Sequence, residues 1–188
     1  ATSIETRRVT VARFIPGGRT AVLEPHELDD EYFMLRIRVD GGQLSTDQLR
    51  VVADVSTTYG RDTADVTDRQ NVQLHWIRVE DVPAIWQRLE AVGLSTTEAC
   101  GDVPRVVLGS PVAGIAAEEV LDPTWAIEEI QRRYIGSAEF SNLPRKFKIA
   151  ISGAFPDRAA VKTHDIGLYI KRSDKGEVGF EVLAGGGQ

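Results

Sequence analysis

The chain has very little cysteine and no long hydrophobic run. Cys100 is the only cysteine among 188 residues. An internal disulfide is therefore excluded, and so is an iron–sulfur cluster held by this chain alone, because such a cluster takes about four thiolates. No apolar run approaches the roughly 20 residues that span a bilayer, and residues 1–10 lack the apolar core of a signal peptide. These absences predict a cytoplasmic protein without a membrane segment.

The chain also lacks an excess of positive charge. The net charge is −6 at pH 7, so a basic surface for nucleic acid is not expected. The length of 188 residues suits one large domain or a domain and a half, and the hydrophobic content of 42% is ordinary for a folded protein. Any site for an anion must therefore come from local clustering of arginine and lysine.

The periodicity of apolar residues predicts a mixture of strands and helices. Helices are expected at about 45–59, 81–92 and 124–135. Strands are expected at 7–15, 32–39, 71–77, 105–109, 145–152, 164–172 and 178–184, with a short strand or loop at 61–68, a turn at 16–18 and a loop at 19–31. The order strand, helix, strand, strand, helix, completed by 105–109, predicts an α+β fold that begins with a ferredoxin-like βαββαβ unit.

Three of the predicted strands carry cations or amides on the face opposite their apolar side chains. Residues two apart in a strand project from the same side, and like charges crowded on one face repel unless an anion lies between them. An Arg-x-Arg or Lys-x-Lys pair is nevertheless most often a solvated sheet face, so the residues alone indicate only an anion-binding domain. The rows are Arg36 with Arg38, Lys146 with Lys148, and Arg69 with Asn71, Gln73 and His75.

Other reactive residues carry weaker signals. His164 is followed by Asp165, but no serine or cysteine stands at a telling position, so a catalytic triad is not predicted. A lone cysteine such as Cys100 is usually a small buried hydrophobe. Trp76 falls on an apolar stripe and is expected in the core.

Four strings give the sequence a family resemblance. In this order they resemble the N-terminal half of the ferredoxin-type sulfite and nitrite reductases, most closely the actinobacterial sulfite reductases. The strings are YFMLRIRVDGG at 32–42, TDRQNVQLHWI at 67–77, TEACGDVPRVVLGSP at 97–111 and NLPRKFKIAISG at 142–153.

The resemblance implies roles for the residues at matching positions. In that family the substrate anion lies beside the iron of sirohaem, ringed by two arginines and two lysines. The matching residues here are Arg36, Arg105, Lys146 and Lys148. Contacts to sirohaem, chiefly its carboxylates, are implied for Arg38, Thr67, Arg69, Asn71, Gln73 and His75.

The resemblance also implies the domains and the partners. Residues 1–115 would form the ferredoxin-like half-domain and 116–188 an incomplete sirohaem-binding domain with part of a mixed sheet. The 4Fe-4S cluster of the family is held by four cysteines of a C-terminal half, so this chain, with Cys100 alone, is expected to share sirohaem with a missing half that carries the cluster. Ferredoxin would be the electron donor, and sulfite or nitrite the substrate.

Three interpretations stay open at this point. The chain is a fragment or one subunit of a split sulfite reductase, incomplete as a catalyst alone. It could instead be a stand-alone half that forms a homodimer and binds a tetrapyrrole or an anion without redox catalysis, because the family is built from two similar halves. The third interpretation is an interaction module that has lost its ligand. The strings favour sulfite over nitrite by resemblance only.

Overall fold

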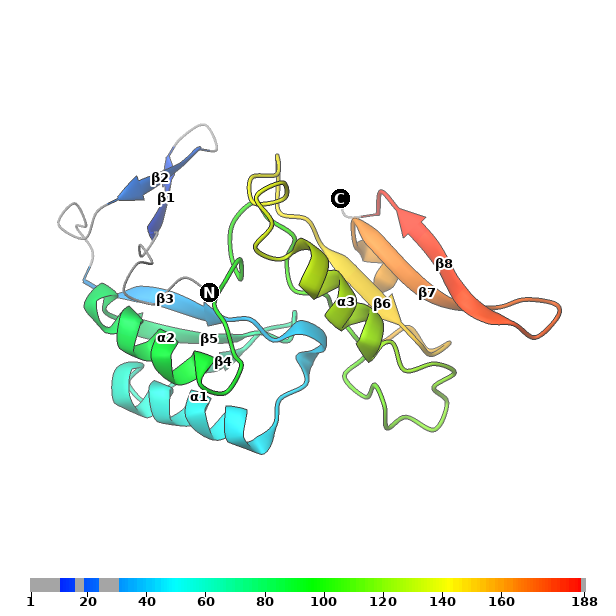
Figure 1. Ribbon diagram of the computed structural model, residues 1–188, viewed down its shortest axis with the longest axis horizontal. Helices are drawn as coiled ribbons and strands as arrows, with labels where there is room; N and C mark the ends of the chain where they lie inside the picture. The colour runs from blue at the N-terminus through cyan, green and yellow to red at the C-terminus, as the bar shows by residue number, and fades with distance from the viewer. Residues whose placement is uncertain (1–10, 16–18, 24–30, 187–188) are drawn as a thin grey trace. The chain divides into compact units, whose positions relative to one another are not determined.

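The computed structural model describes residues 11–15, 19–23 and 31–186, and Figure 1 shows the order of its elements. The strands are β1 (Val11–Ile15), β2 (Arg19–Leu23), β3 (Phe33–Ile37), β4 (Asp65–Val66), β5 (Val72–Ile77), β6 (Ile149–Ser152), β7 (Ile166–Arg172) and β8 (Val178–Ala184). The helices are α1 (Thr46–Tyr59), α2 (Val82–Glu90) and α3 (Thr124–Tyr134), with short 3-10 turns at Asp40–Gly42, Val79–Asp81 and Val161–Thr163. The predicted α+β class is confirmed.

The chain divides into two compact units that are interleaved in sequence. Unit 1 takes its described residues from 1–37, 44–66 and 72–96, and unit 2 from 38–43, 67–71 and 97–188. Arg36 and Arg38, only two residues apart, therefore belong to different units. The boundary expected between residues 115 and 116 stays a prediction.

Unit 1 is built on an antiparallel sheet in which β5 lies between β3 and β4. Figure 1 shows α1 and α2 side by side on one face of this sheet. The order strand, helix, strand, strand, helix agrees with the ferredoxin-like prediction. A separate antiparallel hairpin, formed by β1 and β2, precedes it, and β2 falls where a loop was expected.

Helix α1 begins at a capping box and buries one face. Ser45 Oγ accepts from the backbone N–H of Gln48 at 3.2 Å, and Gln48 Oε1 accepts from the backbone N–H of Ser45 at 2.9 Å. Val52 and Val55 lie in the core, as predicted. Leu49 was expected beside them but is 55% exposed.

Trp76 corrects the predicted alternation of the central strand. Val72 and Leu74 are buried as expected, but Trp76 is 46% exposed and Ile77 takes the buried position. The pairing with β3 shifts register at this point, since Phe33 pairs with Ile77 and Leu35 with Leu74. The φ angle of Trp76 is 63°, so the strand holds one extra residue in the left-handed region and reverses its faces there.

Unit 2 contains a mixed sheet covered on one face by α3. β6 pairs with β7 in parallel, and β7 pairs with β8 as an antiparallel hairpin. Ile149 and Ile151 of β6 form a buried cluster with Ile127 of α3 and with Val107. Burying such side chains is the main source of stability at this site, and the apolar face predicted for 145–152 is confirmed.

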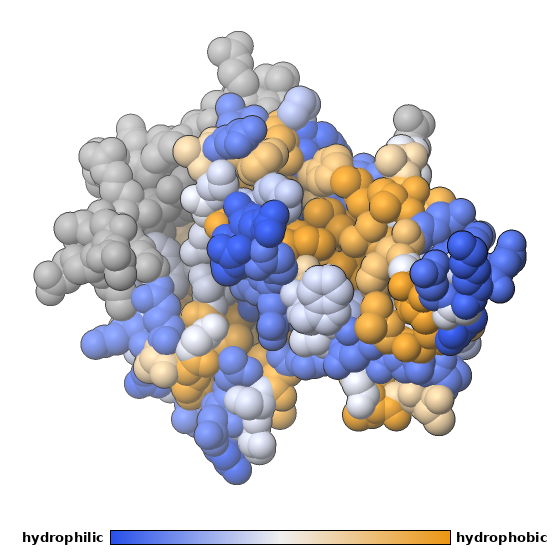
Figure 2. Space-filling view, turned by 45° about the vertical axis from the view of Figure 1, so that its right-hand side comes forward, coloured by the Kyte–Doolittle hydropathy of each residue, from blue (hydrophilic) through white to orange (hydrophobic). Residues whose placement is uncertain are grey.

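The hairpin of β7 and β8 carries apolar side chains that reach the surface of unit 2. Leu168 lies opposite Val182, and Ile170 lies opposite Phe180. Ile170 is fully buried, whereas Val182 is 65% exposed. Figure 2 shows hydrophobic and hydrophilic side chains side by side on this part of the surface.

The segment 105–109 is not a strand of the first sheet, which corrects the predicted sixth element of the ferredoxin-like unit. Isolated parallel bridges pair Pro104 with Phe147 and Leu108 with Ala150, so the segment follows the sheet of unit 2 instead. Its irregular backbone leaves several carbonyl groups free to accept from side chains. None of the helices in the described ranges is long and apolar enough to cross a membrane.

Candidate functional site

Unit 1 contributes a polar row from neighbouring strands of its sheet. Arg36 of β3 lies directly opposite Gln73 of β5. With its amide oxygen turned toward the guanidinium, Gln73 accepts from Nε of Arg36 at 3.1 Å and also from Nη2. His75 Nε2 lies 2.9 Å from Asp65 Oδ2, and both of these side chains are exposed. Arg36, Gln73 and His75, which the sequence places in two separate rows, therefore all lie on strands of unit 1.

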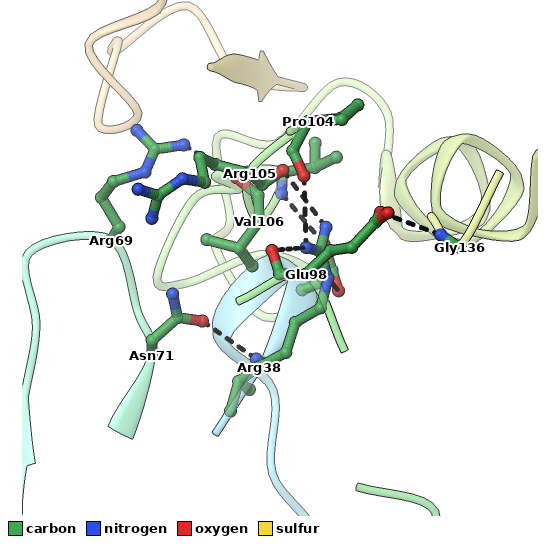
Figure 3. A network of polar contacts seen from close by, with 11 residues as sticks. Arg38, Arg69, Asn71, Glu98, Pro104, Arg105, Val106 and Gly136 are labelled. Carbon is green, nitrogen blue, oxygen red and sulfur yellow. Dashed lines mark hydrogen bonds and ion pairs between the residues drawn. The ribbon is translucent and has the colours of Figure 1, made fainter. Parts of the chain in front are cut away.

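Arg38, in unit 2, is enclosed by acceptors of the chain itself. Its Nε and Nη2 donate to the two carboxylate oxygens of Asp40 at 2.7 and 2.9 Å. The remaining bonds go to the backbone oxygens of Glu98 at 3.1 Å, Pro104 at 3.3 Å and Arg105 at 3.2 Å. A guanidinium has five N–H donors, so this network, drawn in Figure 3, uses all of them.

Arg69 reaches the next carbonyl of the same irregular segment. Its Nη2 donates to the backbone oxygen of Val106 at 2.7 Å, and its Nη1 lies 2.8 Å from Nε2 of His164. Burial lowers the pKa of Arg69 from its ordinary value; Asp68 opposes this shift, and the positive charge of Arg105 adds to it. The Nε of Arg69 is buried and, within the described residues, has no hydrogen-bond partner.

Arg105 is held next to the two lysines by the backbone. The backbone N–H of Arg105 donates to the backbone oxygen of Phe147 at 2.8 Å. Lys146 and Lys148 flank Phe147 in the sequence, so this bond holds Arg105 next to both lysines. Its side chain donates from Nε to Gly101 O at 2.9 Å and from Nη1 to Ala99 O. Lys146 is exposed and Lys148 half-buried, and neither ammonium forms a hydrogen bond or ion pair within the described residues.

Thr67 and Asn71 shape the turn that carries Arg69. The N–H of Thr67 donates to Asn71 O at 2.9 Å, and the N–H of Asn71 donates to Thr67 Oγ1 at 3.1 Å. Asn71 is buried, and its Oδ1 accepts from the N–H of Val39 at 3.1 Å. Both side chains therefore hold the backbone of unit 2 around Arg69.

Unit 2 gathers most of the predicted cations around one stretch of backbone. Arg38 and Arg69 both bond to carbonyls of residues 104–106, and Arg105 is part of that stretch. Arg36, Gln73 and His75 lie in unit 1. A group of arginines with a buried, unpartnered N–H donor is suited to bind a carboxylate or an oxyanion.

Two residues next to this cluster were not predicted as parts of a site. His164 is 6% exposed and contacts Arg69, and Asp165 Oδ2 accepts from the backbone N–H of Lys148 at 2.7 Å. The one sequence signal for such a role is a histidine beside an aspartate just before a strand. Cys100, expected to be buried, is exposed.

Comparison with protein families matches two models to successive parts of the chain. The "Nitrite/Sulfite reductase ferredoxin-like half domain" matches residues 25–92. The "Nitrite and sulphite reductase 4Fe-4S domain" matches residues 100–188. The first match covers most of unit 1, and the second contains Arg105, both lysines and His164.

Individual relatives agree with these models. The "Sulfite reductase [ferredoxin]" of Mycobacterium tuberculosis is 56% identical over 161 residues, which cover 86% of this chain and 29% of that protein. The "Ferredoxin--nitrite reductase" of Leptolyngbya laminosa is 42% identical, covering 82% of this chain and 31% of that protein. The structure of the Mycobacterium tuberculosis NirA protein aligns with a TM-score of 0.79 at 57% identity, covering 82% of this chain and 28% of that one.

Proposed function

The chain belongs to the nitrite and sulfite reductase family, and on that premise we propose that it forms the anion-binding part of an assimilatory sulfite reductase. In this role it supplies the cations that bind the oxyanion and the contacts to the sirohaem carboxylates. The chain spans 29% of the length of the mycobacterial relative. Reduction of sulfite to sulfide with electrons from ferredoxin is thus proposed for the complete enzyme, in which another polypeptide region holds the 4Fe-4S cluster.

The observation that carries the proposal is the buried Nε of Arg69. A buried N–H without an acceptor costs free energy unless a ligand satisfies it, and this donor belongs to an arginine whose other contacts already fix its plane. The carboxylates that surround the sirohaem ring are acceptors of the required charge. A cofactor carboxylate at this position would satisfy that donor, which supports the proposal.

In this proposal the predicted residues have three kinds of role. Arg69, Gln73 and His75 are the residues that would contact the cofactor. Arg38 has no donor left for a ligand, so we assign it, with Asn71 and Thr67, to the framework around Arg69 rather than to the cofactor itself. The oxyanion-binding set remains Arg36, Arg105, Lys146 and Lys148.

The cations would act on the substrate through charge. Lys146 and Lys148 carry ammonium groups without ion-pair partners in the described residues, so their charge is available to an anion. Such groups stabilise the negative charge that develops on oxygen as an S–O bond breaks, and an ammonium can also donate a proton to that oxygen. When bound, sirohaem and the cluster would supply the electrons.

Sulfite is proposed over nitrite on the strength of the relatives. The mycobacterial sulfite reductase is 56% identical, against 42% for the nitrite reductase of Leptolyngbya laminosa. Both anions carry oxygens that arginine and lysine recognise in the same way. Steady-state kinetics with each anion on the reconstituted enzyme would measure the preference as a ratio of kcat/KM values.

Replacement of the lysines tests the proposed role of the cations. We expect Lys148→Ala and Lys146→Ala, in enzyme reconstituted with a polypeptide that carries the four cluster cysteines, to lower kcat/KM for sulfite about 100-fold each, the usual range for loss of a charge-stabilising or proton-donating group. Lys175→Ala, in the exposed turn between β7 and β8, is the matched control and should leave the rate unchanged. Equal rates for all three variants would reject the proposal.

A further inference from the structure

His164 lies at the end of a 3-10 turn, between two groups that demand opposite roles from its ring nitrogens. Its Nδ1 is 2.9 Å from the backbone oxygen of Ala160, and its Nε2 is 2.8 Å from Nη1 of Arg69. The side chain is almost fully buried. No part of the proposed chemistry described above uses this histidine.

The two contacts together determine the protonation of the ring. A carbonyl oxygen only accepts, so Nδ1 must carry a hydrogen and donate it to Ala160. A guanidinium only donates, so Nε2 must be unprotonated and accept from Arg69. The geometry therefore requires the neutral ring with its hydrogen on Nδ1.

The surroundings of the ring agree with this requirement. Burial lowers the pKa of His164, and the positive charges of Arg69 and Lys148 lower it further, while the bond to Ala160 and the charge of Asp165 act in the opposite direction. Thr163 Oγ1, at 3.4 Å from Nδ1, is a further polar neighbour of the ring. A protonated His164 would place a third cation beside Arg69 and Lys148.

The contact with His164 also fixes the orientation of the Arg69 guanidinium. His164 accepts from Nη1 and the oxygen of Val106 accepts from Nη2, so two anchors hold the guanidinium plane, while Nε has no hydrogen-bond partner within the described residues. A guanidinium that is already held at two points loses little further conformational entropy when it binds a carboxylate. Without the histidine, Arg69 would keep a single anchor at Val106.

We propose that His164 is a positioning residue, which as a neutral hydrogen-bond acceptor holds the guanidinium of Arg69 in the orientation that presents Nε–H to a cofactor carboxylate. The inference rests on the proposed function, because Arg69 is assigned to the cofactor there. It also predicts that cofactor binding depends on pH. Protonation of His164 would break its bond to Arg69, so the affinity for the carboxylate should fall as the ring is protonated. The neighbouring Asp165 holds the backbone of Lys148 in the same region.

Nitrogen NMR of the isotope-labelled chain tests the first step without any cofactor. We expect the ring of His164 to show the neutral form with hydrogen on Nδ1 at pH 7, and Arg69→Met to raise its pKa, because a facing positive charge is removed. A ring that is protonated at pH 7, or that carries its hydrogen on Nε2, would overturn the inference whatever the chain binds.

Sirohaem titration of four variants tests the second step. His164→Leu, which removes the acceptor, should weaken binding about tenfold, as expected for a bond to a charged group. His164→Gln, whose amide oxygen can replace Nε2 without titrating, should keep the affinity and lose its dependence on pH. In an Arg69→Met background, His164→Leu should have no further effect.

The outcomes separate a positioning role from a structural one. An equal loss of affinity on His164→Leu in the wild-type and Arg69→Met backgrounds would overturn the inference, since a general packing defect acts in both. Circular dichroism and thermal unfolding of each variant establish that it is folded. If the wild-type chain bound no sirohaem, the proposed function would fail, whereas the NMR result would still decide whether His164 holds Arg69.

Discussion

Arg38 and Asp40 form a two-pronged ion pair in the interior of unit 2, with Nε–Oδ2 and Nη2–Oδ1 distances of 2.7 and 2.9 Å and side-chain exposures of 2% and 4%. Asp40 Oδ1 also accepts from the N–H of Val107 at 3.0 Å. The pair therefore joins the segment after β3 to the irregular segment that carries Arg105. This relationship explains why an arginine on a predicted ligand-binding face is part of the framework.

Removal of this arginine should destabilise the fold strongly. Arg38→Met leaves the Asp40 carboxylate buried without its partner, and breaking a buried pair in this way costs about 3–5 kcal/mol. Urea unfolding gives the change in the free energy of unfolding. The matched control is Arg50→Met, which breaks an exposed pair with Asp47 and should cost less than about 1 kcal/mol. Similar losses in the two variants would show that Arg38 is not a framework residue.

Gly153 offers a second test of the fold, just after β6. A Cβ at this position would overlap the backbone oxygen of Leu121, and the oxygen of Gly153 accepts from the N–H groups of Val120 and Leu121. Gly153→Ala should therefore lower the free energy of unfolding by about 3 kcal/mol. Gly179→Ala in β8, where a Cβ has open space, should change it by less than about 1 kcal/mol. An unfolding midpoint that Gly153→Ala leaves unchanged would contradict this packing.

The stability of the chain should depend on pH through His164. Its pKa in the folded chain is lowered by burial and by Arg69 and Lys148, so the unfolded chain binds the proton first as the pH falls below about 6.5. The free energy of unfolding contributed by this group is complete above that pH and decreases below it, until the folded chain is protonated as well.

His164→Gln lacks this dependence and provides the comparison. Between about pH 7.5 and about pH 5.5, the wild-type chain should lose stability relative to the variant, as measured by urea unfolding at each pH. Parallel curves for the two proteins would mean that folding leaves the proton affinity of His164 unchanged.

The regular elements could be predicted from sequence because their side chains alternate or repeat. The faces of β3 and β6 followed from periodicity, and so did the burial of Val52 and Val55 in α1. Two exceptions are Leu49, which is exposed, and Trp76, where one extra residue in a bulge reverses the faces of β5. A local left-handed residue of this kind leaves no mark on hydrophobic periodicity.

The contacts that define the site could not be predicted in the same way. Arg38 bonds to carbonyls about 60 residues away, and His164 bonds to Arg69 across 95 residues. The acceptors of residues 104–106 are available because that segment forms only isolated bridges instead of the predicted strand. Such contacts depend on tertiary folding of an irregular segment, on which spacing in the sequence carries no information.

Titration of the chain with sirohaem, followed by visible absorption, measures the proposed cofactor binding itself. We expect a saturable shift of the absorption bands with the wild-type chain at micromolar concentration, and with Arg50→Met as a folded control. Arg69→Met, which removes the unpartnered N–H, should weaken the binding about tenfold or more. A spectrum that the wild-type chain leaves unchanged, both alone and with a complementary polypeptide that carries the cluster cysteines, would contradict the proposed binding.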